Sequence, residues 1–367
     1  MTTISHASFE KMESFMKDVF IKVGVPVEDA AICAEILIES DKRGIDSHGV
    51  GRFKPIYIDR IRDGIQNPVT NFEVVKDHLA TAVVDGHDGM GHVIGKKSMQ
   101  LAIDKAKKYG IGMVVVRNST HYGIAGYYAT MAASSGLIGI TGTNARPSIA
   151  PTFGVENMLG TNPLTFGLPT DEDFPFVLDC ATSVTQRGKI EHYDRINKTM
   201  PEGWVINRDG SSESDPAKAL AGLNKGICAL APLGGLGEDT AGYKGYGYAA
   251  VVEILSASLQ QGLFLKALDG IDQSGRKIPF HLGHFFIAVD INAFTEPALF
   301  KKTTGDILRE LRASAKAPGQ ERIYTAGEKE YLAWLSRKDT GVPLNDSLKK
   351  TLKTLIDEYG LDAYDFD

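Results

Sequence analysis

Residues 95–118 read GKKSMQLAIDKAKKYGIGMVVVRN, a helical pattern that changes into a short β-type run at Gly110. The same change recurs along the middle of the chain. Further β-type runs lie at 80–86, 137–145, 175–183 and 283–291, and a second helical pattern lies at 248–263. Strands that alternate with helices predict an α/β body of two or three layers.

Helical patterns also occupy both ends of the chain. Apolar residues from Phe9 to Val23 fall on one stripe at helical spacing, and a second helical run ends at Gly44. The last part of the chain carries three further helical runs. We expect the two ends to pack together as a helical domain, residues 1–75 with 296–367, beside an α/β domain of residues 76–295.

The composition excludes several classes of protein. The 367 residues are 43% hydrophobic and 23% charged, as is usual for a globular protein. The net charge of −6 argues against nucleic acid as the main partner, since phosphate binding relies on excess Lys and Arg. The polar, acidic N-terminus and the absence of a long apolar run predict neither a signal peptide nor a membrane segment. The three cysteines are isolated in the sequence, which favours the cytoplasm, where thiols stay reduced.

Glycine-rich stretches invite a nucleotide-binding interpretation. In GMGHVIG (89–95), Ile94 stands where a Rossmann fingerprint needs its third glycine, so a turn that caps the following helix is the better interpretation. His87 and His92 lack the spacing of metal ligands, and we expect no metal. Residues 189–245 are rich in glycine and are expected to be mostly loop.

Polar residues cluster just after the second helical run. The stretch IDSHGVGRF (45–53) places Ser47, His48 and Arg52 beyond a helix end, and we expect a loop, where functional residues are frequent. A second histidine, His121, follows the strand-like run GMVVVRN. It should therefore lie at the edge of the sheet where ligand crevices open in α/β proteins.

Two histidines and an arginine, without a metal site, are compatible with the oxidation of a 2-hydroxy acid. An imidazole with a pKa near neutrality takes the hydroxyl proton. An arginine holds the substrate carboxylate with two hydrogen bonds, and a nicotinamide accepts the hydride. A hydrolase triad of Asp46, Ser47 and His48 is excluded, because adjacent side chains on one loop do not line up as orienter, nucleophile and base.

Five stretches, in this order, resemble the malate/L-lactate dehydrogenase family of NAD(P)-dependent oxidoreductases. They are DSHGVGR (46–52), STHYGIAGYYA (119–129), GTNPLTFGLP (160–169), LDCATSVTQRGKI (178–190) and YKGYGYA (243–249). The resemblance runs over nearly the whole chain. Residues 144–163 and 321–338 are similar to the malate-type branch of the family.

The resemblance implies a dinucleotide-binding α/β fold that differs from the Rossmann fold, and a homodimer with its active site near the subunit boundary. It implies that the proton acceptor is His121 or His48; both remain candidates, and His121 is preferred. Arg52 matches the arginine that binds the substrate carboxylate, with Ser47 beside it in the pocket. Arg146 stands where many relatives have a smaller residue, and it can approach the second carboxylate of malate.

The resemblance also implies a set of cofactor contacts. They are Asp179, Cys180, Ala181, Thr182, Ser183, Val184, Thr185, His192, Tyr243, Lys244, Gly327 and Glu328. Small hydroxyl residues beside a strand end suit a pyrophosphate, and Lys244 on an exposed glycine-rich loop supplies a point charge. One departure concerns spacing: this chain has one more residue between Arg52 and Tyr57 than members that carry RLPxY.

We therefore predict a cytoplasmic NAD(P)-dependent 2-hydroxyacid dehydrogenase that acts on malate and oxaloacetate, with NAD as the cofactor and NADP as the alternative. Other reactions of the family are alternatives: oxidation of ureidoglycolate, sulfolactate or lactate, and reduction of a cyclic imine. A protein that only binds the dinucleotide is the alternative from another class. A proton acceptor beside a carboxylate clamp argues against it. Arg187, Lys189 and His192 are candidates to bind the 2′-phosphate of NADP.

Overall fold

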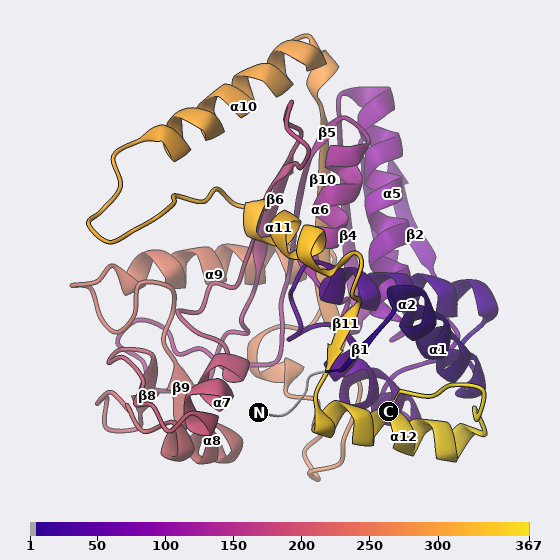
Figure 1. Cartoon of the computed structure of the whole chain (residues 1–367), viewed down its shortest axis with the longest axis vertical. Coiled ribbons are helices and arrows are strands. Elements are labelled where there is room, and N and C mark those ends of the chain that lie inside the picture. The colour runs from indigo at the N-terminus through magenta and orange to yellow at the C-terminus, as the bar shows by residue number, and fades with distance from the viewer. Residues whose placement is uncertain (1–4, 367) are drawn as a thin grey trace.

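A seven-stranded sheet forms the centre of the molecule (Figure 1) in this computed structural model, which describes residues 5–366. Residues 1–4 and 367, which belong to the predicted N-terminal and C-terminal helical segments, lie outside the described residues. The strands are, in spatial order, β2 (Glu73–His78), β3 (Thr81–Asp85), β4 (Ile111–Ser119), β10 (Leu282–Asp290), β5 (Leu137–Thr143), β6 (Leu164–Leu168) and β7 (Phe176–Cys180).

Most neighbouring strands in this sheet are antiparallel. Within residues 5–366, only β3 and β4 pair in parallel. Strand β10, from late in the chain, lies between β4 and β5 and pairs with both. The five predicted strands are confirmed, whereas β2 and β6 were not predicted. Strand β2 was not predicted because all six of its side chains are exposed. Its sequence EVVKDH therefore lacks the alternation of buried and exposed positions that marks a strand.

Three helices pack on the two faces of the sheet: α5 (Gly91–Tyr109), α6 (Ala125–Ser134) and α9 (Gly242–Ala257). Successive side chains of a strand point to opposite faces. Val114 and Phe286 pack in a core with α5 and α6, whereas Val115 and Phe285 pack in another core with Val252 of α9. The α/β body therefore has three layers, which the sequence left open between two and three (Figure 1).

The two chain ends pack together beside the sheet (Figure 1). The elements are β1 (Ser5–Ala7), α1 (Phe9–Lys22), α2 (Val27–Lys42), β11 (Val342–Leu344) and α12 (Asp346–Tyr359). Strands β1 and β11 pair antiparallel, and Phe15, Phe20 and Leu355 are completely buried in one shared core. The two ends therefore share one core, while the division of the chain into a helical domain and an α/β domain stays a prediction.

The expected loop over residues 189–245 contains regular structure. Its elements, with α7 beginning just before it, are α7 (Arg187–Arg195), β8 (Val205–Asn207), α8 (Pro216–Lys225) and β9 (Cys228–Leu230). Asp215 caps α8 by accepting from the N–H of Lys218 at 3.1 Å, and Pro216 is its first residue. Val205 and Leu230 are buried in a small core of their own. These elements were not predicted because the glycines weaken the helix and strand propensities of the sequence without preventing tertiary packing.

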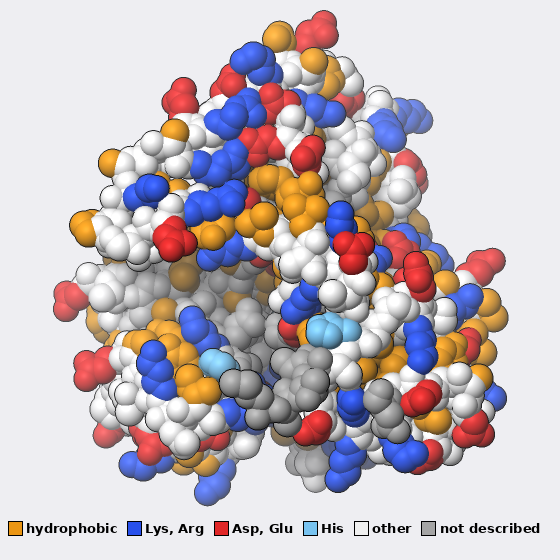
Figure 2. All heavy atoms as spheres, viewed as in Figure 1, with side chains coloured by type: hydrophobic (Ala, Val, Ile, Leu, Met, Phe, Trp, Pro, Cys, Tyr) orange, Lys and Arg blue, Asp and Glu red, His pale blue; other side chains and the backbone are white. Residues whose placement is uncertain are grey.

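The remaining helical elements near the chain's C-terminal part are η2 (Leu265–Leu268), η3 (Ile291–Ala293), α10 (Pro297–Ala313) and α11 (Glu328–Arg337). Lys and Arg side chains gather over α10 on the face drawn in Figure 2. The three cysteines are unpaired, and Cys33 and Cys228 are buried. Among residues 5–366, no helix combines the length and the apolar composition that a membrane crossing needs.

Candidate functional site

His121 lies just beyond the end of β4, in the turn that leads to α6. The prediction that it sits at a strand end is confirmed. Its Nδ1 is 2.6 Å from the hydroxyl oxygen of Tyr57, and it also faces the N–H of Gly123 at 3.3 Å. The ring of His48 stacks beside it, with 5.9 Å between the ring centres and 19° between the planes. The two predicted histidines are therefore neighbours, although His48 follows helix α2 and His121 follows strand β4.

The stretch IDSHGVGRF is helical from Val50 onward, which corrects the expected loop. Its elements are α3 (Val50–Arg52), the π-helix η1 (Phe53–Ile58) and α4 (Asp59–Arg62). The buried Asp41 of α2 accepts a hydrogen bond from the N–H of Val50 at 2.8 Å. A side chain at Gly49 would meet the Asp41 carboxyl oxygens at 2.2 Å, so only glycine fits there. Burial raises the pKa of Asp41 to about 8, so at neutral pH it accepts this bond mainly as a neutral acid.

The π-helix suits the additional residue that the family resemblance implies between Arg52 and Tyr57. A π-helical turn closes its hydrogen bond over five residues, one more than an α-helical turn. The N–H of Asp59 donates to the carbonyl of Lys54 in this pattern. One added residue is thereby absorbed within the turn, and Tyr57 still reaches His121. Such π-turns are frequent at functional sites.

Both histidines are neutral at neutral pH. Burial, and then the charge of Arg52, lower the pKa of His48 to about 4. Burial lowers the pKa of His121 well below its ordinary value, and the neighbouring His48 and Arg60 add to the effect. A neutral imidazole has a free nitrogen lone pair, so either ring has the protonation state of a proton acceptor. We call His48, Arg52, Tyr57 and His121 the histidine–arginine cluster.

The arginines near this cluster lack carboxylate partners. Arg52 donates from Nε to the carbonyl of Ser47 at 2.8 Å, while the Ser47 hydroxyl lies 2.9 Å from Nδ1 of His48. Arg146 is exposed, and within residues 5–366 neither Arg52 nor Arg146 forms an ion pair. Arg60 of α4 is a third arginine of this kind. Arg60 could not be predicted as a site residue, because nothing in the motif DSHGVGR marks a residue two turns later.

A pocket of about 410 Å³ brings together two predicted cofactor residues, Asp179 and Gly327. Asp179 accepts from the N–H of Gly126 at 2.7 Å and from the Thr165 hydroxyl at 3.1 Å. Asp179 is open to the pocket, and desolvation by the surrounding protein raises the pKa of its carboxyl group. Gly327 adopts φ +90°, and a side chain there would meet the carbonyl oxygen of Pro175 at 2.7 Å. The pocket wall therefore depends on a glycine at position 327.

The segment that follows Asp179 runs beside the turn before α9. Cys180 and Ala181 are half-buried, and Val184 donates its N–H to the carbonyl of Ala231 at 3.0 Å. Thr182 uses its hydroxyl within the protein, at 3.0 Å from the carbonyl of Asn162.

Two hydroxyl groups of the same segment lack protein partners. The side-chain oxygens of Ser183 and Thr185 are buried and have no hydrogen-bond partner among the described residues. Buried polar groups normally find partners, so these two are suited to a polar ligand such as a dinucleotide. Lys244 lies in the first turn of α9 and not on a loop as expected, 5.8 Å from the ring centre of the exposed Tyr243. A helix N-terminus with a lysine suits a pyrophosphate.

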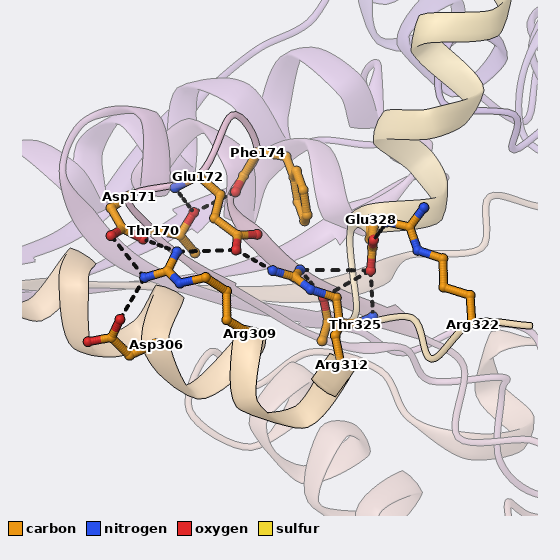
Figure 3. A network of polar contacts seen from close by, with 10 residues as sticks. All are labelled: Thr170, Asp171, Glu172, Phe174, Asp306, Arg309, Arg312, Arg322, Thr325 and Glu328. Atoms are coloured by element: carbon orange, nitrogen blue, oxygen red, sulfur yellow. Dashed lines mark hydrogen bonds and ion pairs between the residues drawn. The ribbon is translucent and has the colours of Figure 1, made fainter. Parts of the chain in front are cut away.

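Two predicted cofactor residues are placed differently. His192 is exposed on α7, and no described contact joins it to the other cofactor candidates. Glu328 is only 2% exposed and lies in a network of arginines and carboxylates between α10, α11 and the turn before β7 (Figure 3). Its carboxylate pairs with Arg322 and Arg312, and it accepts from the N–H of Thr325 at 3.0 Å. This carboxylate is therefore engaged by protein groups.

Comparison with known proteins identifies close relatives. The family model described as malate/L-lactate dehydrogenase matches residues 7–353. A malate dehydrogenase of Pyrococcus horikoshii is 43% identical over 96% of this chain and 95% of its own. An L-sulfolactate dehydrogenase of Methanocaldococcus jannaschii is 40% identical over 97% and 98%. The crystal structure of a malate dehydrogenase from Entamoeba histolytica superimposes with a TM-score of 0.94 at 45% identity and covers 98% of this chain and 99% of that one.

Proposed function

This chain belongs to the malate/L-lactate dehydrogenase family and is a 2-hydroxyacid dehydrogenase that uses a nicotinamide cofactor, and on that premise we propose that its histidine–arginine cluster interconverts malate and oxaloacetate. The observation that carries this assignment of the site is the neutral His121, held by Tyr57 beside an arginine without a carboxylate partner. A 2-hydroxy acid needs a proton acceptor and a carboxylate clamp within reach of each other, and the cluster provides both.

In the direction of malate oxidation, His121 takes the hydroxyl proton. Its Nδ1 faces Tyr57, which leaves Nε2 for the substrate. The bound nicotinamide supplies the hydride acceptor. Arg52 binds the carboxylate next to the reacting carbon and thereby fixes that carbon, while His48 and Ser47 line the pocket.

The hydroxyl of Tyr57 serves both directions of the reaction. When Nδ1 of His121 carries the proton, Tyr57 accepts it in a hydrogen bond and Nε2 is free to take a proton from malate. After it has taken that proton, His121 is an imidazolium whose Nδ1–H still donates to Tyr57, and in the reverse direction it returns the Nε2 proton to the oxygen of oxaloacetate and becomes neutral again. The tyrosine therefore accepts from Nδ1 in both directions and stabilises the imidazolium that forms during oxidation.

Malate is the proposed substrate because malate dehydrogenases match almost the whole chain. Sulfolactate is the second candidate. The relative at 40% identity carries that name, and a sulfonate is also an anion that arginine binds.

We propose NAD as the cofactor, bound between the pocket of Asp179 and Gly327 and the N-terminus of α9, on a sheet unlike the Rossmann fold. Two of the three residues expected to bind the 2′-phosphate of NADP already contact other side chains, and the third, His192, has no described contact with the other cofactor candidates. Arg187 pairs with Glu191 at 2.9 Å, and Lys189 lies over the ring of Trp204. Their engagement favours NAD.

We also propose that the enzyme acts as a homodimer in the cytoplasm. Helix α9 presents an apolar face to solvent, on which Tyr248 and Ile254 are 55% and 57% exposed. A cavity of about 540 Å³ with mostly apolar lining adjoins this face at Tyr246 and Phe264. Apolar surface of this extent is typical of an interface, and a second copy of the chain is the proposed occupant.

The test of the proposed function is a panel of 2-oxo acids with reduced cofactor. Oxaloacetate, pyruvate and 3-sulfopyruvate are each mixed with enzyme and NADH or NADPH, and the absorbance of the reduced nicotinamide is followed. We expect the highest kcat/KM with oxaloacetate and NADH. The malate assignment is wrong if 3-sulfopyruvate or pyruvate is preferred, and the proposed reaction is wrong if no compound turns over.

A further inference from the structure

Arg60 is a half-buried cation for which the protein provides no anion. It lies in α4, one helical turn after Tyr57, so the two side chains leave the helix on the same side. Its guanidinium carbon lies 4.5 Å from the ring centre of Phe280. Within residues 5–366 it forms no ion pair, and its side chain takes part in no hydrogen bond.

Arg62, the other arginine of α4, behaves differently. Arg62 pairs with Asp59 and with Glu358 of α12, as arginines at the surface of this protein commonly do. The groups that act electrostatically on Arg60 are Tyr57 and Arg146, and no carboxylate is among them. Burial lowers the pKa of Arg60, and the positive charge of Arg146 adds to that effect. A largely desolvated, unpaired charge is costly, so a function is expected for it.

The charges around His121 suit a dianion. Arg60 lies one helical turn after Tyr57, whose hydroxyl contacts His121, and its charge contributes to the lowered pKa of His121. The histidines His48 and His121 are neutral, so the positive charge of the site comes from the arginines. One carboxylate neutralises one of them and leaves a second arginine unpaired, whereas a dicarboxylate neutralises two.

We propose that Arg60 binds the second carboxylate of the substrate and thereby selects oxaloacetate and malate over monocarboxylates such as pyruvate and lactate. The face of Phe280 holds the guanidinium in place, so the charge is positioned before the substrate arrives. Arg52, which is held at the carbonyl of Ser47, binds the carboxylate next to the reacting carbon. The exposed Arg146 lies nearer to solvent and adds a weaker, screened attraction.

This inference rests on the proposed reduction of 2-oxo acids and is tested by the change in selectivity of an Arg60→Met variant. Methionine keeps much of the apolar volume over Phe280 and removes the charge. kcat/KM is measured for oxaloacetate and for pyruvate with saturating NADH. We expect oxaloacetate to lose about 100-fold, mainly through a higher KM, and pyruvate to change less than about threefold, because only oxaloacetate carries the second carboxylate.

Three further variants serve as references. Arg60→Lys keeps the charge without the two-pronged geometry and should lose less than Arg60→Met. Arg62→Met, on the same helix but paired with Glu358, should behave as the wild type. Arg146→Ala in the same assay separates the two arginines, since the proposal requires the larger loss at Arg60.

The outcomes decide between the inference and its premise. Equal losses for both substrates would mean that Arg60 only supports packing, and no loss would mean that it does not bind substrate; either overturns the proposal. If pyruvate turnover is too slow to measure, a rise in KM for oxaloacetate without a rise in KM for NADH supports it, and parallel rises overturn it. A wild type that reduces no 2-oxo acid would instead overturn the proposed function, before any variant is compared.

Discussion

At the scale of single residues, the proposed site depends on a histidine that is kept neutral. His121 is half-buried between Tyr57 and His48, and the nearby arginines further oppose its protonation. The motif around His48 and the strand before His121 made both histidines predictable. Tyr57, Arg60 and Asp41 were not predicted as site residues. Tyr57 and Asp41 act through contacts with His121 and Val50 that only the folded chain brings together, and Arg60 stands out only because it lacks an ion pair.

The lowered pKa of His121 predicts the acid side of the pH profile. Malate oxidation needs the unprotonated imidazole, so activity is lost when pH falls through the pKa of His121 in the free enzyme. Because burial, His48 and Arg60 hold that pKa below 6.5, we expect kcat/KM for malate to stay constant down to pH 6.5 and to fall only below it. The measurement is kcat/KM between pH 5 and 9. An acid limb centred at pH 7 or above would contradict this account.

At the scale of elements, two local structures orient the site. The π-helix η1 absorbs one extra residue and still presents Tyr57 to His121. A π-turn over this stretch could not be predicted from the sequence, since the difference between four and five residues per hydrogen bond depends on packing at both ends. The segment from Arg322 to Glu328 is oriented in a comparable way by charges on α10 (Figure 3).

The network in Figure 3 predicts a cofactor effect for Glu328→Gln. The buried Glu328 carboxylate pairs with Arg312 and Arg322, and the adjacent Gly327 lines the pocket proposed for the cofactor. Hydrogen bonds to charged groups are worth about 1.5–3 kcal/mol, so their loss should raise KM for NADH about tenfold or more, with kcat nearly unchanged.

A matched control for this variant lies in the same network. Asp306→Asn removes a more exposed carboxylate that pairs with Arg309 and does not touch Glu328, so its KM for NADH should stay at the wild-type value. Equal KM values for NADH in Glu328→Gln and the wild type would show that the segment does not depend on this ion pair.

At the scale of the whole molecule, the layered α/β body and the joining of the chain ends could be predicted from hydrophobic periodicity. The mixed sheet could not. Alternating strands and helices favour parallel pairing, yet β10 returns from late in the chain between β4 and β5 and makes both pairs antiparallel. Such a long-range insertion leaves no local signal in the sequence, and neither does the edge strand β2 with its exposed side chains.

The apolar face of α9 predicts that the molecule is a dimer in solution. Light scattering coupled to size exclusion should give twice the mass of the chain for the wild type. Ile254→Glu, which puts a charge on that face, should give a monomer with reduced activity. The control is Val69→Glu, at an equally exposed apolar position outside α9, which should remain dimeric. A monomeric wild type, or a dimer in the Ile254→Glu variant, would refute the interface.

The most direct test of the central claim is kcat for oxaloacetate reduction in His121→Gln and His48→Gln, measured with saturating NADH. Because His121 is assigned the proton transfer, kcat of His121→Gln should fall by about 10²–10⁴-fold, while His48→Gln should lose far less. NADH binding, followed by its fluorescence, should persist in both variants. If His121→Gln keeps kcat within tenfold of the wild type, or if His48→Gln shows the larger loss, the assignment of the proton to His121 is wrong.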